Sequence, residues 1–350
     1  MVAKDHGPAM ITATIPVQMA TTKTEAGTRQ HHTMMKGPFA RALRVSVAIG
    51  LTALLLWQSN PSAVVNATRG ADLRLILLAC LLVVVDRVLM AYRWLTLLSP
   101  LAPGQRPSFA VVMRIFFVST FVGTFLPASV GGDAVRALGL SRQGVGGVDA
   151  IASVLMDRLL GILSILIVAI AGAWLATDLV DVRILLPALG VLGVLCAAGG
   201  AVVFNAGAAR VIGYAIARLP RGRETGDRLL AAIQRYSRYR GDLVNVLVCS
   251  IAVQVLRVLQ TYCLGLGLGL TAPLGVYFAL VPLILLIVLM PITINGIGTA
   301  QAGFVWLFGL AGVPSAPAFA LSVLFLAIAI VGNLPGGLLF VFGKRETGRG

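Results

Sequence analysis

The sequence predicts an all-α polytopic membrane protein, with about eight transmembrane helices, at least one re-entrant segment and an internal repeat. Three observations lead to this fold class. The 350-residue chain is 58% hydrophobic and only 12% charged, whereas a soluble domain carries about 25% charged residues. Its mean hydropathy is +0.93, and several apolar runs are long enough to cross about 30 Å of hydrocarbon. A motif of the first half also returns in the second half.

Apolar runs set the expected spans. They fall near residues 43–60, 72–98, 108–127, 150–176, 184–204, 243–266, 274–291, 299–313 and 316–342. Residues 1–40 are polar and rich in threonine, so we expect a disordered tail there and a membrane domain over residues 41–345. Residues 205–242 are expected to form an arginine-rich loop.

The distribution of basic residues predicts the orientation, because cytoplasmic loops carry an excess of Lys and Arg. The loop 205–242 contains eight arginines, and basic residues also precede the first span. We therefore expect a multi-pass protein of the inner (plasma) membrane with a cytoplasmic N-terminus. Five full crossings before residue 205 would place the arginine-rich loop outside, so one segment must enter and leave on the same side.

Residues 108–140 are the candidate for that re-entrant segment, because the apolar run ends in proline and glycine followed by charge. Irregular backbone at membrane depth is tolerated where protein or a water-filled cavity satisfies its polar groups. The alternative is that the segment spans fully and that the loop is external despite its charge.

The stretch FLPASVGGDAVR places a charge pair and helix breakers in apolar sequence. Gly131 and Gly132 permit close backbone approach and left-handed dihedrals. Asp133 and Arg136 have helical i,i+3 spacing and are expected to pair. A helix beginning near Asp133 would direct free N–H groups toward Gly131 and Ser129, and such an end binds anions, including phosphate. The alternative is that the charge pair only caps and locks the re-entrant loop.

A second motif repeats part of the first. PASVGG, beginning at Pro127, returns as PITING, beginning at Pro291. Transporters often place broken helices at matching positions of internal repeats, where they form a midplane site, so Thr293 and Asn295 join the candidate binding residues. The alternative is chance similarity, because Gly and Pro are frequent in membrane helices. An inverted repeat would place the C-terminus outside, and a full span at 274–291 would place it inside.

Ionisable side chains inside the apolar runs mark candidate sites, because an arginine at the bilayer centre costs about 2.5–3.5 kcal/mol. Asp157 and Arg158 are expected to act as a structural charge pair. Arg257, which is flanked by two glutamines, is expected either to contact a ligand or to form a structural hydrogen bond. For Arg87 and Arg93, snorkelling to the cytoplasmic interface is the favoured interpretation.

The residue inventory excludes several other classes of protein. All three histidines precede residue 40, and the four cysteines lie in apolar runs without a CxxC pair, so no metal site and no cofactor are expected. The net charge of +15 is expected to serve topology and attraction to anionic lipids. Nucleic-acid binding would require a basic domain in water, and we expect none.

Together the motifs resemble those of the lysylphosphatidylglycerol synthase transmembrane-region family, the flippase-like domain of the multiple peptide resistance factor. The resemblance covers about residues 43–342 and rests mainly on the run from Pro127 to Arg136. It implies handling of polar lipids, with movement of a headgroup between leaflets, in a stand-alone form without the aminoacyl-transferase domain. The chain departs from the family where Thr299-Ala-Gln301 replaces the usual Arg-Glu pair, so a narrow substrate assignment does not transfer.

The expected function is therefore to bind or translocate a polar lipid between leaflets, whether a phospholipid, a glycolipid or an isoprenoid-linked lipid. The expected partners are membrane lipids with anionic headgroups, bound mainly by Arg136. We expect no enzymatic activity. One alternative is a membrane-embedded transferase acting on a lipid-linked donor, which would need acid–base or metal-binding residues together. Another is an accessory subunit for a lipid-synthesis enzyme or a glycosyltransferase. The oligomeric state is left open.

Overall fold

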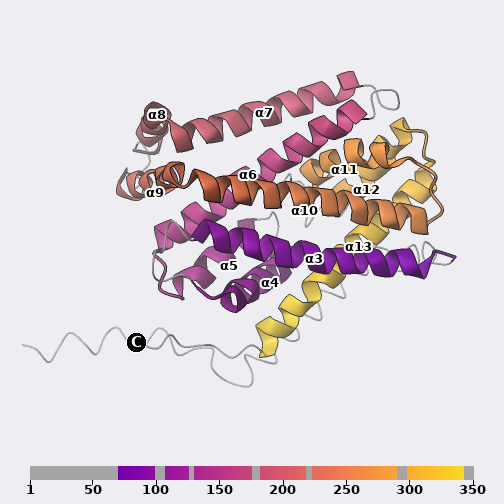
Figure 1. The fold of residues 1–350 in the computed structure, drawn as a ribbon, viewed down its shortest axis with the longest axis horizontal. Helices are drawn as coiled ribbons and strands as arrows, with labels where there is room; N and C mark the ends of the chain where they lie inside the picture. The colour runs from indigo at the N-terminus through magenta and orange to yellow at the C-terminus, as the bar shows by residue number, and fades with distance from the viewer. Residues whose placement is uncertain are drawn as a thin grey trace, which may run out of the picture. The chain divides into compact units, whose positions relative to one another are not determined.

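The computed structural model describes residues 70–98, 107–125, 130–175, 182–217, 223–289 and 298–342. Within these ranges the chain forms eleven α-helices and no strand (Figure 1), which confirms the all-α prediction. The predicted tail, the first predicted span and the candidate residues Ser129, Thr293 and Asn295 lie outside the described residues.

The helices follow the predicted spans closely. They are α3 (Leu73–Leu98), α4 (Phe109–Phe125), α5 (Val130–Ser141), α6 (Gly147–Leu175), α7 (Val182–Phe204), α8 (Ala206–Ala217), α9 (Arg223–Arg235), α10 (Arg240–Gly267), α11 (Leu274–Leu289), α12 (Thr299–Leu310) and α13 (Ser315–Phe342). Each of the eight predicted spans that falls within the described residues corresponds to one of these helices. The segment 205–242, predicted as a loop, instead contains α8, α9 and a short 3₁₀ turn.

Four of the described helices, α3, α6, α10 and α13, are long and apolar enough to cross a membrane. At about 1.5 Å per residue, helices of this length exceed a hydrocarbon layer of about 30 Å. The helices α4, α5, α11 and α12 are shorter, with 17, 12, 16 and 12 residues. Four long helices, two pairs of short helices and α7, with its shorter apolar stretch Leu189–Phe204, therefore form the membrane part that is described.

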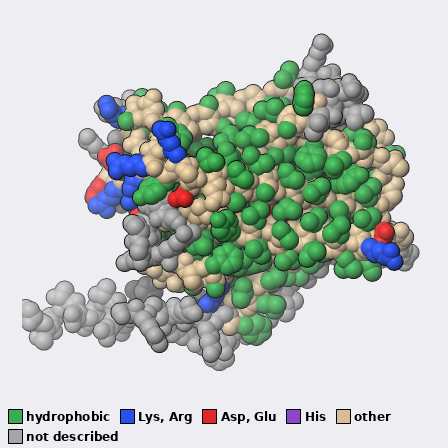
Figure 2. Space-filling model, viewed as in Figure 1, with side chains coloured by type: hydrophobic (Ala, Val, Ile, Leu, Met, Phe, Trp, Pro, Cys, Tyr) green, Lys and Arg blue, Asp and Glu red, His purple; other side chains and the backbone are tan. Residues whose placement is uncertain are grey.

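The outer surface of this part is apolar. Figure 2 shows hydrophobic side chains across the face formed by α3, α7 and α10, with charged side chains gathered at its two ends. On α3, Leu77, Leu81 and Val84 are exposed, whereas Asp86 and Arg93 are buried. Because the apolar side points outward and the charged side inward, this helix has the polarity expected of a helix that contacts lipid.

Two long helices, α3 and α10, lie side by side in opposite directions (Figure 1). The backbone N–H of Asp72, at the start of α3, donates to the carbonyl of Gly267, at the end of α10, over 3.0 Å. Near mid-helix, Arg93 donates to Ser250 over 3.0 Å, and Arg257 donates to Asp86 over 3.1 Å.

These two mid-helix contacts correspond to each other. Arg257 lies 164 residues after Arg93, and Ser250 lies 164 residues after Asp86. Arg93 contacts Ser250, which lies seven positions before Arg257, the counterpart of Arg93. Arg257 in turn contacts Asp86, which lies seven positions before Arg93. The same offset separates Pro127 from Pro291 in the sequence motifs, so one register relates both the motifs and the contacts.

The remaining helix packing follows the same register. Helix α4 packs against α13, and α11 packs against α6. Both contacts depend on a glycine, because a Cβ on Gly172 would lie 2.1 Å from the carbonyl oxygen of Phe278, and one on Gly336 would lie 2.0 Å from that of Phe117. Gly336 again lies 164 residues after Gly172. The set α3–α4–α5–α6 and the set α10–α11–α12–α13 thus share one order of long, short, short and long helices, with α7, α8 and α9 between them.

The helices between these two sets are anchored by a separate apolar cluster. Ala232 and Tyr236 pack with Met156 of α6 and Val246 of α10. The buried Tyr236 hydroxyl donates to the carbonyl of Leu97 over 2.9 Å, and burial raises the pKa of this phenol well above its usual value. This cluster fixes the end of α9 against both sets of helices.

Candidate functional site

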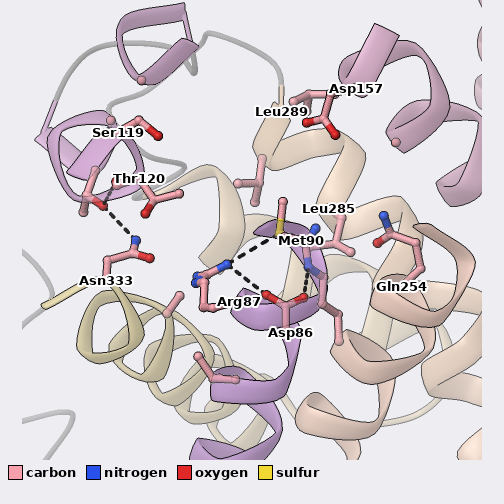
Figure 3. A pocket seen from close by; sticks show the side chains of 18 of the residues that line it. Asp86, Arg87, Met90, Ser119, Thr120, Asp157, Gln254, Leu285, Leu289 and Asn333 are labelled. Carbon is pink, nitrogen blue, oxygen red and sulfur yellow. Dashed lines mark hydrogen bonds and ion pairs between the residues drawn. The ribbon is translucent and has the colours of Figure 1, made fainter. Parts of the chain in front are cut away.

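A cavity of about 340 Å³ opens among the helices of both sets (Figure 3). Its described lining comes from α3, α4, α5, α6, α10, α11 and α13. The lining contains five arginines and three aspartates: Arg87, Arg93, Arg136, Arg158, Arg257, Asp86, Asp133 and Asp157. A cluster of this size inside a membrane domain marks a candidate functional site, because charges there are costly and rare.

Asp157 and its two arginine partners form the most buried ion-pair group of the charge cluster. The Oδ1 atom of Asp157 lies 2.6 Å from Nη2 of Arg93, and its Oδ2 atom lies 2.9 Å from Nη1 of Arg136. The three side chains are 4–6% exposed. The interpretation that Arg93 snorkels to an interface is therefore wrong, because this side chain is buried against Asp157 and Ser250.

Asp133 forms a bidentate ion pair with Arg158. Nε and Nη2 of Arg158 each donate to one carboxylate oxygen over 2.8 Å. The predicted pairing of Asp133 with Arg136 on one helix is wrong, and so is the predicted pairing of Asp157 with Arg158. Each acid pairs across to the other helix instead, so the four side chains join α5 to α6 through two crossed ion pairs.

Arg136 has further neighbours that restrict it. Its guanidinium carbon lies 5.1 Å from the ring centre of Trp94 and 5.0 Å from that of Phe116. A cation between two aromatic faces gains favourable electrostatic contact with both rings. Arg136 lines the cavity, but its side chain is only 6% exposed. It is therefore held firmly as part of the wall.

The carboxylate of Asp86 forms ion pairs with two arginines from different helices (Figure 3). Nη1 of Arg87 lies 2.9 Å from Oδ2 of Asp86, and Nε of Arg257 lies 3.1 Å from Oδ1. Snorkelling is thus wrong for Arg87 as well, because its side chain is 12% exposed and turned toward Asp86. The Arg257 side chain is 23% exposed, so it offers the cavity more surface than Arg136 does.

The glycine motif has a different role from the predicted one. Helix α5 begins at Val130 rather than near Asp133, so Gly131 and Gly132 have helical backbone conformations instead of left-handed ones. The predicted close approach does occur at Gly132, where an added Cβ would lie 2.9 Å from the carbonyl oxygen of Ser119 on α4. Gly132 lines the cavity, and its missing side chain lets α5 pack directly on α4.

Several uncharged polar residues of the lining were not predicted as site residues, although Gln254 was noted as a neighbour of Arg257. Asn333 of α13 donates to Thr124 of α4 over 2.9 Å, and Gln254 of α10 donates to Ser164 of α6 over 3.3 Å. Asn333, Ser119 and Thr120 lie on one side of the cavity and Gln254 on the other (Figure 3). The sequence signal for such residues is a single amide side chain within an apolar run. It was used for the glutamines beside Arg257 but not for Asn333.

The departure from the family pattern after the second motif has a local structural effect. Gly298 has a φ of 87° and stands before the first residue of α12. Its N–H donates to Oε1 of Gln301 over 2.6 Å. The side chain of Gln301 thus satisfies a backbone donor at the beginning of α12.

Residues 41–336 match the family described as the lysylphosphatidylglycerol synthase TM region. Among curated proteins, a UPF0104 membrane protein of Pyrococcus horikoshii is 28% identical over 156 residues, which is 44% of this chain and 46% of the relative. The match thus spans less than half of the relative's length.

Proposed function

Because the chain belongs to the lysylphosphatidylglycerol synthase TM region family and is a multi-pass membrane protein, we propose that it binds a polar lipid and moves it between leaflets. The proposed substrates are a phospholipid, a glycolipid or an isoprenoid-linked lipid. The proposed location is the inner (plasma) membrane, with a cytoplasmic N-terminus.

One observation carries this proposal: the cavity is both charged and apolar. Its arginines and aspartates come from α3, α5, α6 and α10, whereas Leu285, Leu289 and Phe325 come from α11 and α13. A soluble substrate needs no apolar wall of this kind. A lipid has both a charged headgroup and acyl chains, so it matches both parts of the lining.

The repeated helix order supports a transport mechanism. The sets α3–α6 and α10–α13 meet through the antiparallel pair α3 and α10, as in inverted-repeat transporters, whose substrate sites lie at the repeat interface. We propose that the short pairs α4–α5 and α11–α12 are re-entrant hairpins. The cavity would then open alternately to either leaflet as one repeat rocks against the other.

The lining also favours transport over catalysis. A transferase needs a carboxylate or another base that is free to accept a proton. In the described lining, each oxygen of Asp86, Asp133 and Asp157 lies within 3.1 Å of a guanidinium nitrogen. We therefore propose a binding and transport role without chemistry on the lipid.

The proposal is tested by reconstituting the full chain in liposomes that contain fluorescent lipids and measuring how fast the lipids of the inner leaflet become accessible to an external quencher that cannot cross the membrane. We expect faster exchange than in protein-free liposomes for at least one lipid of a broad panel. Arg136→Gln should slow exchange, because it removes a wall cation while Arg93 still neutralises Asp157. The matched control is Arg228→Gln, since Arg228 is exposed and pairs with Glu224 away from the cavity. Exchange at the protein-free rate for every lipid would refute the proposal.

A further inference from the structure

We infer that the cavity selects a lipid whose headgroup is an anionic phosphate with hydroxyl groups, and rejects headgroups that carry an amine. This inference rests on the proposed function and specifies the substrate class of the same site. It separates phosphatidylglycerol-like and sugar-phosphate lipids from zwitterionic and cationic ones. The chain would thus differ from what its family's name suggests, because a lysyl headgroup is cationic.

The first step concerns the carboxylates, which are the groups that would bind an ammonium. The three aspartates of the described lining have six oxygens, and each oxygen already has a guanidinium nitrogen within 3.1 Å. An entering ammonium would have to displace an arginine from one of these pairs. The described lining therefore offers an amine no free anionic partner.

The second step concerns net charge. Five arginines face three aspartates in the described lining, which leaves a surplus of two positive charges. Inside a membrane domain such a surplus is poorly screened by solvent. A phosphate reduces it, whereas an ammonium increases it, so the field in the cavity favours an anion over a cation.

The third step concerns hydrogen-bond donors. Among the described residues, the buried Nε atoms of Arg87, Arg93 and Arg136 have no hydrogen-bond partner, and neither does Nε2 of Gln260. All four residues line the cavity. A buried donor without a partner is costly, and phosphate oxygens are strong acceptors for guanidinium groups. A bound phosphate provides acceptors where the lining has an excess of donors.

The fourth step concerns the remaining acceptors. Oε1 of Gln254 and Oδ1 of Asn333, on opposite sides of the cavity (Figure 3), are buried without a hydrogen-bond partner among the described residues. Oδ1 of Asp157 also makes no hydrogen bond there, but it lies 2.6 Å from Nη2 of Arg93 in an ion pair. The two amide oxygens are neutral and accept hydrogen bonds from hydroxyl groups. A glycerol or sugar headgroup provides such hydroxyls. The phosphate and hydroxyl groups of one headgroup therefore complement the two kinds of unpartnered atoms.

Arg257 is better suited to contact the phosphate than the buried arginines, and the more exposed Arg158 already uses Nε and Nη2 for Asp133. Arg257 uses Nε for Asp86, is 23% exposed and comes from the second repeat. Its removal leaves Asp86 paired with Arg87, so the fold keeps a neutralised carboxylate. Arg257→Gln is consequently a variant that changes the ligand site without leaving a buried acid unpaired.

The test measures binding to the purified full chain in detergent micelles by native mass spectrometry. The probes are short-chain phosphatidylglycerol, phosphatidylethanolamine and lysyl-phosphatidylglycerol, with glycerol phosphate as the probe that lacks acyl chains. We expect phosphatidylglycerol to bind at least about tenfold more tightly than either amine-bearing lipid. Losing a charged hydrogen bond corresponds to about a 10- to 100-fold change in affinity, so Arg257→Gln should weaken phosphatidylglycerol binding by about that factor. Arg257→Lys, which keeps the charge, should retain part of it, and the exposed Arg228→Gln should change nothing.

Each outcome decides one point. Equal or tighter binding of an amine-bearing lipid overturns the selectivity, while the proposed lipid binding stands. Binding of no lipid overturns the proposed function itself. Glycerol phosphate binding as tightly as phosphatidylglycerol shows a site for a soluble phosphate and overturns the inference of a lipid. Unchanged phosphatidylglycerol binding in a folded Arg257→Gln variant overturns the assignment of Arg257.

Discussion

Replacing Asp157 by Asn should destabilise the protein strongly, because one buried carboxylate neutralises two buried arginines. Asn has nearly the same shape, so the change removes charge without creating a cavity. The Arg93 and Arg136 side chains are 4% and 6% exposed, and within the described ranges Asp157 is the acid that each forms an ion pair with. Breaking a buried pair by removing one partner costs about 3–5 kcal/mol. We expect a loss of at least that size, since two cations are left unpaired.

The measurement is the free energy of unfolding in mixed micelles, followed as a denaturing detergent is titrated. The control is Glu224→Gln, which removes an ion pair with Arg228 whose side chains are 80% and 68% exposed. Exposed pairs of this kind contribute about 0.2–1 kcal/mol. The double change Asp157→Asn with Arg136→Gln should be less destabilising than the two single losses added together, because only Arg93 then lacks a countercharge.

The reasoning would be refuted if Asp157→Asn lost no more stability than Glu224→Gln. Strict additivity in the double variant would also contradict it. Either result would mean that the arginines find other partners or reach water once the carboxylate is gone.

Three further predictions test the packing. Gly336→Val should cost about 1–3 kcal/mol or more by overpacking, because a Cβ there lies 2.0 Å from a backbone oxygen, whereas Gly190→Ala, with no atom within 4 Å of its Cβ, should be harmless in thermal unfolding. Leu75→Cys with Gly267→Cys, in a background without native cysteines, should form a disulfide seen as a gel shift, since the two Cβ atoms lie 3.6 Å apart and disulfides need about 3.5–4.5 Å. Tyr236→Phe should lose about 0.5–1.5 kcal/mol with its hydrogen bond. Folding raises the pKa of Tyr236, so its contribution to stability should be present below about pH 10, the ordinary phenol pKa, and fall above it. The measurement is the free energy of unfolding as a function of pH, with ultraviolet absorbance reporting ionisation of the phenol.

Results that contradict these predictions are equally definite. A stable Gly336→Val variant would mean that α13 and α4 are farther apart than described. Absence of the disulfide under oxidising conditions would argue against the antiparallel pairing of α3 with α10. A Tyr236 that titrates in the folded protein near its ordinary pKa would contradict its burial.

The helices were predictable from the sequence because hydrophobic length alone determines them. The run 72–98 became α3 (Leu73–Leu98), and 274–291 became α11 (Leu274–Leu289). The amphipathic helix α9 was missed because its mean hydropathy is low and its arginines suggested a loop. Its spacing of Leu229, Leu230 and Ile233 was the signal that a search for helical periodicity would have found.

The charged positions were predictable, but their partners were not. Asp133, Arg136, Asp157 and Arg158 all belong to the cluster, yet each pairs with a residue on another helix. Sequence spacing indicates only which residues share a helix face. The contact of Arg257 with Asp86 joins residues 171 positions apart, and such a contact depends on how α3 and α10 pack.

The two proposed repeats carry unequal charge, and this inequality should determine where a ligand binds. Asp86, Asp133 and Asp157 all belong to the first repeat, and the residues 164 positions later are Ser250, Ile297 and Leu321. Of the five cavity arginines, Arg257 alone comes from the second repeat. The second repeat instead supplies apolar lining from α11 and α13. The phosphate of a headgroup should therefore lie against the arginines of the first repeat, and Arg257 should reach it across the interface between the repeats. The hydroxyl groups should reach Gln254 and Asn333 of the second repeat, with the acyl chains along α11. Rocking of one repeat would change the distance from Arg257 to the other arginines and so couple binding to the opening of the cavity.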